Sequence, residues 1–428
     1  MKKLLAILLA LVMVFALAAP TAFADDTTIT LWTYPIGGWG NSDVVDELIA
    51  GFEAANHGIK VQVEYLAYAD GDAKVNTALE GNAAPDLIME GPERLVATWG
   101  AKGYMVDIAD LWDDADKEEV LPVVQAACFN KEGASYEYPL CMTAHCMAVN
   151  LARFQAVGAD QYLDLDSHTW TTEGFVEAVK LLAAENPNVA AVFCSGQGGD
   201  QGTRALINNL YSGTFTDADH SKYTADSEEN IKALELLAGL EGVNFDPAIN
   251  GGEEINLFRQ GILDMAFCWN IGAQLNTADG NEPGFTNDGD EIVCMAFPSD
   301  DGVPELCGGI WGFGIFDNGD AAKIDAAKTF IKYMADSAAT PDAVKASTYF
   351  AVRDKSDDVD LSGIYEGNDI MSEYTKLMPF LGDYYQVVPG WAEARTAWWN
   401  MLQQVGAGAG VAESVTAFCE AANAAAGA

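Results

Sequence analysis

Ala84-Pro85-Asp86-Leu87-Ile88-Met89-Glu90-Gly91-Pro92-Glu93-Arg94 is the stretch that decides the predicted fold. Its run Leu87-Ile88-Met89 is short and apolar and follows a Pro-Asp turn, which is typical of a buried strand. Pro92 suits the first position of a helix, because its fixed φ fits there and its missing N–H would be unsatisfied anyway. In open α/β sheets, ligands bind where strands end and helices begin. We therefore expect Glu90, Glu93 and Arg94 to bind a ligand, although an Arg–Glu pair capping a surface helix would explain them equally well.

Tryptophans supply the other candidate binding residues. Carboxylates and a guanidinium form charge-assisted hydrogen bonds with hydroxyls, and an indole ring can stack against the apolar face of a polyol. Trp39 lies in a glycine-rich loop with little local core to join. Trp269 and Asn270 end a predicted strand, whereas Trp311 lies within a strand and is as easily a core residue. Trp391 lies one helical turn from Arg395, a spacing that fits a ligand pair or a structural one equally well.

Strands alternate with helices along the chain, which predicts an α/β fold with a mostly parallel sheet. With 428 residues the chain is long enough for two domains. No linker separates two halves, so we expect the chain to cross between its lobes more than once. The predicted strands span 28–34, 59–66, 87–89, 291–298 and 307–316, and the main predicted helices span 44–55, 73–79, 170–184, 226–240, 321–334 and 393–404.

The first 24 residues are predicted to be a secretory signal peptide. Lys2 and Lys3 precede an apolar run over 4–18, and Ala22-Phe23-Ala24 matches a small-residue cleavage site. The short apolar core and this site disfavour an uncleaved membrane anchor. We expect an exported protein, at the outer face of the cytoplasmic membrane or cell wall, or in the periplasm if the source has an outer membrane.

The charge balance excludes some partners. The chain has 22 basic and 64 acidic residues, a formal net charge of −42. Nucleic acids and anionic membranes require a basic surface, so neither is an expected partner. The acidity also disfavours an anionic ligand such as a glycerol phosphate, although one local arginine could override it.

The eight cysteines are expected to be mostly free, buried thiols. An even number in an exported protein permits disulfides, but most have apolar neighbours, as small core residues do. No Cys-x-x-Cys pair is present and the four histidines are scattered. We therefore expect no metal site and no cofactor. The cysteines are Cys128, Cys141, Cys146, Cys194, Cys268, Cys294, Cys307 and Cys419.

Five blocks, in this order and spacing, resemble the family 1 extracellular solute-binding proteins of ABC sugar importers, relatives of maltose-binding protein. The resemblance runs from about Thr28 to about Gly406. Three departures are His168 in place of a usual proline, Ala351 in place of another, and Asp25 where many relatives carry a lipid-modified cysteine, which leaves lipid anchoring unsupported. The blocks are Ala84–Ile88, Tyr138–Asn150, His168–Phe175, Phe258–Trp269 and Gly308–Ile315.

The resemblance implies two α/β lobes joined by hinge crossings, with the ligand in the cleft between them. The expected N-lobe is 27–142 plus 299–343, and the expected C-lobe is 143–298 plus 344–420. By position, Glu93 and Arg94 match an acid–arginine pair that contacts sugar in the family. Glu90 stands where a stacking tryptophan is found, and Trp269 and, less certainly aligned, Trp391 match tryptophans of the cleft.

The expected function is an extracytoplasmic, monomeric binding component that captures a neutral carbohydrate, preferably an oligosaccharide, and delivers it to an ABC permease. It is not expected to be an enzyme. An exported glycoside hydrolase is the main alternative, and would need two carboxyl groups about 5–10 Å apart across a glycosidic bond. A binding protein for a glycerol-phosphate-type anion is the second alternative.

Overall fold

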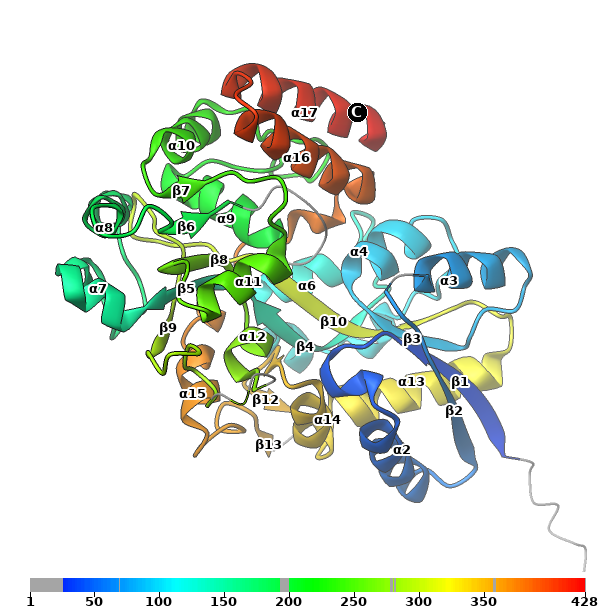
Figure 1. Cartoon of the computed structure of the whole chain (residues 1–428). Helices are drawn as coiled ribbons and strands as arrows, with labels where there is room; N and C mark the ends of the chain where they lie inside the picture. The colour runs from blue at the N-terminus through cyan, green and yellow to red at the C-terminus, as the bar shows by residue number, and fades with distance from the viewer. Residues whose placement is uncertain are drawn as a thin grey trace, which may run out of the picture.

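The chain forms two lobes, each built around its own β-sheet (Figure 1). The structure, a computed structural model, describes residues 26–427 except 69, 193–199, 278–279, 281 and 357–358, and it does not describe the side chains of 200, 201 and 385. The expected signal peptide and Cys194 therefore lie outside the described residues.

The N-lobe is the part built on a six-stranded sheet with the order β11-β4-β10-β3-β1-β2. Strands β1, β2 and β3 are parallel, while β10 is antiparallel to both β3 and β4, and β11 is antiparallel to β4. The predicted parallel arrangement therefore holds for the first three strands. It fails for β10 and β11 because the chain re-enters this sheet from the other lobe. The strands are β1 (Thr27–Thr33), β2 (Ile59–Tyr65), β3 (Leu87–Glu90), β4 (Tyr138–Ala144), β10 (Gly308–Ile315) and β11 (Phe350–Ala351).

Helices cover both faces of this sheet. On one face, Phe330 of α13 packs edge-to-face on Phe313 of β10 and on Phe52 of α2. On the opposite face, the side chains of Leu95 and Met105 lie close to Gly314 of β10, where a Cβ would collide with Met105. The N-lobe helices are α2 (Ser42–Ala55), α3 (Gly71–Glu80), α4 (Pro92–Arg94), α5 (Asp114–Glu119), α6 (Pro122–Cys128), α13 (Ala321–Ala335) and α14 (Thr340–Ser347), with short helices η1 (Gly37–Gly40), η2 (Leu95–Gly100) and η3 (Ala109–Leu111).

The C-lobe is the part built on a smaller antiparallel sheet with the order β8-β5-β9, and β6 and β7 form a separate parallel pair, with β6 packed against β8. The C-terminal helices α16 and α17 pack on each other and α17 packs on α10, at the top of Figure 1. The strands are β5 (Cys146–Asn150), β6 (Ala190–Ala191), β7 (Val243–Asn244), β8 (Met265–Trp269) and β9 (Ile292–Met295). The helices are α7 (Leu151–Val157), η4 (Ala159–Tyr162), α8 (Thr172–Ala183), α9 (Asp200–Leu210), α10 (Glu228–Gly239), α11 (Gly251–Arg259), α12 (Ile271–Leu275), α15 (Asp369–Thr375), α16 (Trp391–Gly406) and α17 (Val411–Ala426).

Three segments pass between the two sheets. The first is His145, between β4 and β5, whose N–H donates to the carbonyl of Cys307 on the second segment, which joins β9 to β10. The third leaves β11 and includes the hairpin of β12 (Lys355–Ser356) with β13 (Val359–Asp360) and the turns η5 (Met378–Phe380) and η6 (Tyr385–Val387). The expected boundary at residue 343 falls inside α14, and both α14 and β11 pack on the N-lobe sheet.

Several local expectations can be compared with the structure. Pro92 is at the start of α4, with Gly91 as the N-cap, as predicted. The cap of α8 is Thr171, whose side chain accepts from the N–H of Gly174, so the helix expected over 170–184 begins two residues later, at Thr172. The seven described cysteines are all buried and free, which confirms the thiol prediction for them.

A buried ionic network ties the third segment to the N-lobe. Arg353, just after β11, is 2.7 Å from Asp116 of α5, and both side chains are almost fully buried. The hydroxyl of Tyr138 donates to the same carboxylate at 2.7 Å, and Lys332 of α13 lies 3.2 Å from it. Burial would raise the pKa of Asp116, but the hydrogen bonds from Tyr138 and Arg353 outweigh it and lower the pKa.

Removing the charge of Asp116 should therefore destabilise the protein. Asp116→Asn breaks the shorter of two ion pairs of the buried Arg353 guanidinium and leaves it the 3.4 Å pair with Asp336. Breaking a buried ion pair costs up to about 3–5 kcal/mol. Urea unfolding at neutral pH measures this loss. Asp110→Asn is the matched control, because Asp110 pairs with Lys328 at the surface and such pairs contribute about 1 kcal/mol or less. Equal losses in the two variants would contradict the prediction.

Candidate functional site

Three parallel strands of the N-lobe end at one edge of the sheet, and polar side chains gather there. Tyr34 follows β1, Tyr68 follows β2, and Glu90 is the last residue of β3. Helix α4 begins two residues after Glu90 and brings in Arg94. The carboxyl ends of parallel strands are the place where open α/β sheets bind ligands.

Arg94 is the centre of this group. Its Nε lies 2.7 Å from Oδ1 of Asp72 in α3, and its Nη1 lies 2.7 Å from Oε1 of Glu90 and 3.4 Å from Oε1 of Glu93. The guanidinium also lies over the ring of Tyr34, 5.4 Å from the centroid, and the Tyr34 hydroxyl donates to Oδ1 of Asp72 at 2.5 Å. Burial would lower the pKa of Arg94, but the carboxylates of Glu90 and Glu93 outweigh it, so the guanidinium stays charged.

Glu90 is the most deeply buried of the three carboxyl groups around Arg94. Its side chain is 1% exposed, and its Oε2 has no hydrogen-bond partner among the described residues. Burial raises the pKa of Glu90 to about 8; Arg94 opposes this rise, while Glu93 and Asp72 add to it. Three carboxylates beside one guanidinium cannot all be ionised cheaply in a buried place, so the innermost one holds a proton near neutral pH.

A fourth carboxyl group, that of Glu137, lies near enough to Glu90 and Glu93 for their charges to act on it. Glu137 comes immediately before β4, is fully buried, and neither of its oxygens has a hydrogen-bond partner among the described residues. Burial raises its pKa well above the ordinary value, and the nearby charges of Glu93 and Glu90 raise it further. Gly312 of β10 pairs with Glu90 of β3, and because it has no side chain it can lie close to the backbone of Tyr138, the residue after Glu137.

Aromatic rings form the rest of the site. Tyr34 and Tyr68 are stacked with their centroids 5.1 Å apart, and Trp311 and Tyr349 are stacked at 4.7 Å and 15°. Burial raises the pKa of Tyr349 to about 12, with Cys141 and Glu90 contributing, and Glu90 likewise adds to the burial that raises the pKa of Tyr68. Tyr34 lies under the guanidinium that pairs with Glu90, and Trp311 directly precedes Gly312, the strand partner of Glu90, so the two pairs of rings lie on either side of this carboxyl group's neighbours.

The third crossing segment closes the group from the other side. The Tyr384 hydroxyl donates to Oε2 of Glu93 at 2.9 Å, and Tyr384 is 4% exposed. We call the assembly the acid–aromatic cluster. Its members are Tyr34, Tyr68, Asp72, Glu90, Glu93, Arg94, Glu137, Trp311, Tyr349 and Tyr384.

Four of the eight site residues predicted from the sequence therefore lie together. Glu90, Glu93 and Arg94 are in direct contact, and Trp311 belongs to the same cluster through Tyr349. Trp39 does not join them. Its loop folds as η1 against α14, and its buried indole N–H donates to the carbonyl of Ala343 at 3.1 Å, so the glycine-rich loop has a core to pack into after all.

The predicted residues of the C-lobe lie elsewhere. Trp269 is fully buried; it packs edge-to-face on Phe258, and its indole N–H donates to Oε1 of Gln274 at 2.8 Å. The Asn270 side chain caps α12 by accepting from the N–H of Ala273. Trp391 is 9% exposed and lies under the guanidinium of Arg204, 4.7 Å away. Its expected neighbour Arg395 instead lies over Trp399.

The sequence analysis missed several members of the cluster. Tyr34 and Tyr68 follow strands next to β3, so strand-end reasoning could have found both once the order of the strands was guessed. Tyr384 lies 291 residues from Glu93, and no local pattern signals that contact. The missed residues are Tyr34, Tyr68, Asp72, Glu137, Tyr349 and Tyr384.

Comparison with known families gives the identity of the fold. The family described as bacterial extracellular solute-binding protein matches residues 39–341. The chain belongs to this family. Comparison with curated protein sequences finds no relative at a significant level of similarity.

Solved structures similar to this solute-binding protein agree with the fold. A solute-binding protein of an ABC transporter from Agrobacterium radiobacter, in complex with ribitol, is 22% identical with a TM-score of 0.66, covering 94% of this chain and 99% of its own. The GacH receptor of Streptomyces glaucescens, studied with acarbose, is 16% identical with a TM-score of 0.68, covering 92% and 97%. A cyclic α-maltosyl-1,6-maltose binding protein from Arthrobacter globiformis is 19% identical with a TM-score of 0.68, covering 94% and 99%. At these identities the likeness shows the fold alone.

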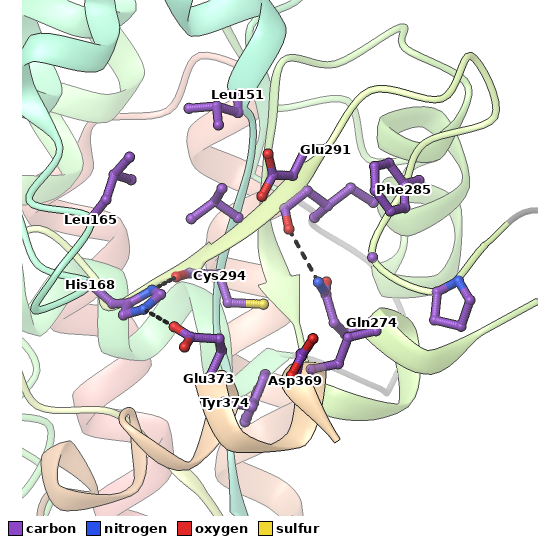
Figure 2. A pocket seen from close by; sticks show the side chains of 15 residues that line it. Leu151, Leu165, His168, Gln274, Phe285, Glu291, Cys294, Asp369, Glu373 and Tyr374 are labelled. Carbon is purple, nitrogen blue, oxygen red and sulfur yellow. Dashed lines mark hydrogen bonds and ion pairs between the residues drawn. The ribbon is translucent and has the colours of Figure 1, made fainter. Parts of the chain in front are cut away.

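A hollow of about 340 Å³ lies on the C-lobe of the solute-binding protein, between β9 and α15 (Figure 2). Much of its lining is apolar, and four of its six polar side chains, those of His168, Gln274, Glu373 and Tyr374, are bonded within the protein. The other two are the carboxylates of Glu291 and Asp369. His168 bridges the carbonyl of Cys294 and the carboxylate of Glu373, and Gln274 is bonded through both its oxygen and its nitrogen. Few polar atoms remain to orient a ligand, so the acid–aromatic cluster is the better candidate site.

The protonated Glu90 predicts a pH dependence of stability. Between about pH 4.5 and about pH 8 the folded chain holds a proton on Glu90 that the unfolded chain has lost, so this group makes stability fall as pH rises. Glu90→Gln removes that contribution, so between pH 5 and pH 8 the variant should lose less stability than the parent, by up to about 3 kcal/mol. Urea unfolding at both pH values checks this, with the exposed Glu47→Gln as control. If the parent and Glu90→Gln lose the same free energy of unfolding between pH 5 and pH 8, Glu90 is ionised at both pH values and the prediction is wrong.

Proposed function

We propose that this protein captures a carbohydrate at the acid–aromatic cluster and delivers it to the membrane permease of an ABC transporter. The observation that carries the proposal is the cluster itself: two aromatic stacks flank buried carboxyl groups and a guanidinium at the end of the N-lobe sheet. Sugar rings offer apolar C–H faces to aromatic rings and hydroxyls to charged groups. The descriptions of three similar structures name ribitol, acarbose and a cyclic maltosyl-maltose as ligands.

The two lobes supply the means of capture. We infer the expected lobes, an N-lobe of 27–142 plus 299–343 and a C-lobe of 143–298 plus 344–420, except that residues 344–351, which complete α14 and β11, move with the N-lobe. Tyr384, on the third crossing segment, already reaches Glu93 of the N-lobe. Bending at the crossings would open the site, and closure around the sugar would exclude water and present a closed form to the permease.

The arrangement of the carboxyl groups favours binding over hydrolysis. A glycoside hydrolase needs an acid and a second carboxylate facing each other across the scissile bond. Here Asp72, Glu90 and Glu93 converge on one guanidinium instead. An anionic ligand such as a glycerol phosphate is disfavoured as well, because it would have to approach these carboxyl groups. Incubation with chromogenic glycosides should release no product.

We infer that the protein acts outside the cytoplasm as a monomer. Its family is extracellular. Among the residues that the structure describes, none of the helices is both long and apolar enough to cross a membrane. The expected cleavage after Ala24 would leave Asp25 at the N-terminus, without a cysteine for a lipid anchor.

A ligand screen followed by calorimetry tests the proposal. Sugars that bind only the folded state raise its melting temperature, so a panel of mono- and oligosaccharides should give at least one clear shift. Arg94→Lys keeps the charge but loses the planar fork and should weaken the best sugar at least tenfold. Arg153→Lys, at an exposed position of α7, is the matched control and should bind as the parent does. No shift with any sugar, or equal affinity in both variants, would overturn the proposal.

A further inference from the structure

The acid–aromatic cluster contains more carboxyl groups than cations. Among the described residues, Arg94 is the cation that contacts Asp72, Glu90 and Glu93, and Glu137 adds a fourth carboxyl group. Neutral hydroxyls can donate to these carboxyl groups but bring no charge to offset the excess, and each additional buried carboxyl group costs desolvation. The excess therefore points to a ligand that brings positive charge.

Three buried oxygens in the cluster lack a hydrogen-bond partner among the described residues. They are Oε2 of Glu90 and both carboxyl oxygens of Glu137, on side chains that are 1% and 0% exposed. A buried acceptor left unpaired costs about 1–3 kcal/mol, and more if it is charged. At Glu93 the equivalent need is met by the Tyr384 hydroxyl. The oxygens of Glu90 and Glu137 have no such partner among the described residues, and each would need a donor once its carboxyl group is ionised.

Titratable groups from all the surrounding elements lie near Glu90. Among the described residues in this group, Arg94 is the one that carries a positive charge. A second cation would be attracted by the carboxyl groups and, in addition, by the faces of the four aromatic rings. A neutral hydroxyl gains little from the ring faces. The titratable groups facing Glu90 are Tyr34 after β1, Tyr68 after β2, Asp72 of α3, Glu93 and Arg94 of α4, Glu137 before β4, Tyr349 before β11 and Tyr384 before η6.

We propose that the carbohydrate bound at the acid–aromatic cluster carries an amine, so that its ammonium group donates to Oε2 of Glu90 and is neutralised by Glu90 and Glu137. This inference rests on the proposed function and names its substrate class. An ammonium has three N–H donors and no acceptor, which matches acceptors that lack donors. Glu90 then exchanges its proton for the ammonium, and the proton passes to the solvent.

The charge of the whole chain works in the same direction. With a formal net charge of −42 the protein attracts cations over long range. Attraction to an amino sugar would thus weaken as salt is added, whereas binding of an uncharged sugar would be almost independent of salt.

Matched sugars that differ at one substituent test the inference on the full chain. The sets are mono- and trisaccharides of glucosamine, of N-acetylglucosamine and of glucose, titrated calorimetrically at pH 7. We expect the amine to bind at least tenfold more tightly than the hydroxyl or the acetamide, and more weakly in high salt. Titration in buffers of different ionisation enthalpy should show a proton released for the amine alone.

Variants of the buried acids test whether Glu90 and Glu137 cause the preference for the amine-bearing sugar. Glu90→Gln and Glu137→Gln should each reduce the amine preference at least fivefold. Glu254→Gln is the matched control, because Glu254 is also fully buried but lies in the C-lobe and bonds the N–H of Phe267, and it should keep the preference. Glu93→Gln, at a less buried position, provides a second acid-to-amide test if the buried variants fail to fold.

The outcomes separate this inference from the proposed function. If the hydroxyl member binds as well as the amine, or the preference survives in all three cluster variants, the inference is wrong while the carbohydrate function stands. If no member of any set binds and the wider sugar panel gives no melting shift, the proposed function fails and the inference fails with it.

Discussion

A single guanidinium shared by several carboxyl groups is the constraint on which the proposed site depends. Arg94 holds Asp72, Glu90 and Glu93 within hydrogen-bond or ion-pair distance, and it draws together α3, the end of β3 and the start of α4. Because one cation cannot neutralise all of these acids, the innermost carboxyl group stays protonated near neutral pH. The site is thus held in place by a charge arrangement that a ligand can complete.

Glycines in the central strand of the N-lobe sheet let its strands lie close together beside this arrangement. Strand β10 returns from the C-lobe and enters between β3 and β4, and its glycines let the chains approach closely. A Cβ on Gly312 would lie 2.3 Å from the carbonyl oxygen of Tyr138, so no other residue fits there without moving the strand. The same crossing that links the lobes therefore also brings the strand of Glu90 and the strand that follows Glu137 to the two sides of β10.

Local patterns in the sequence predicted the elements well, and contacts between distant segments poorly. The apolar run ending at Glu90 and the proline at 92 were enough to predict β3, α4 and the contact of Glu90, Glu93 and Arg94. Tryptophan identity alone did not separate core from site: Trp39 and Trp269 each found an internal acceptor for the indole N–H. The contact of Tyr384 with Glu93 depends on how the third crossing segment folds back onto the N-lobe, which no short stretch of sequence determines.

The most direct test of the account is a crystal structure of the protein with the sugar that raises its melting temperature most. The account predicts a ligand donor within about 3.2 Å of Oε2 of Glu90, with a sugar ring against Tyr68 or Tyr349. A sugar bound instead in the hollow beside His168, with Oε2 of Glu90 still unpartnered, would contradict it.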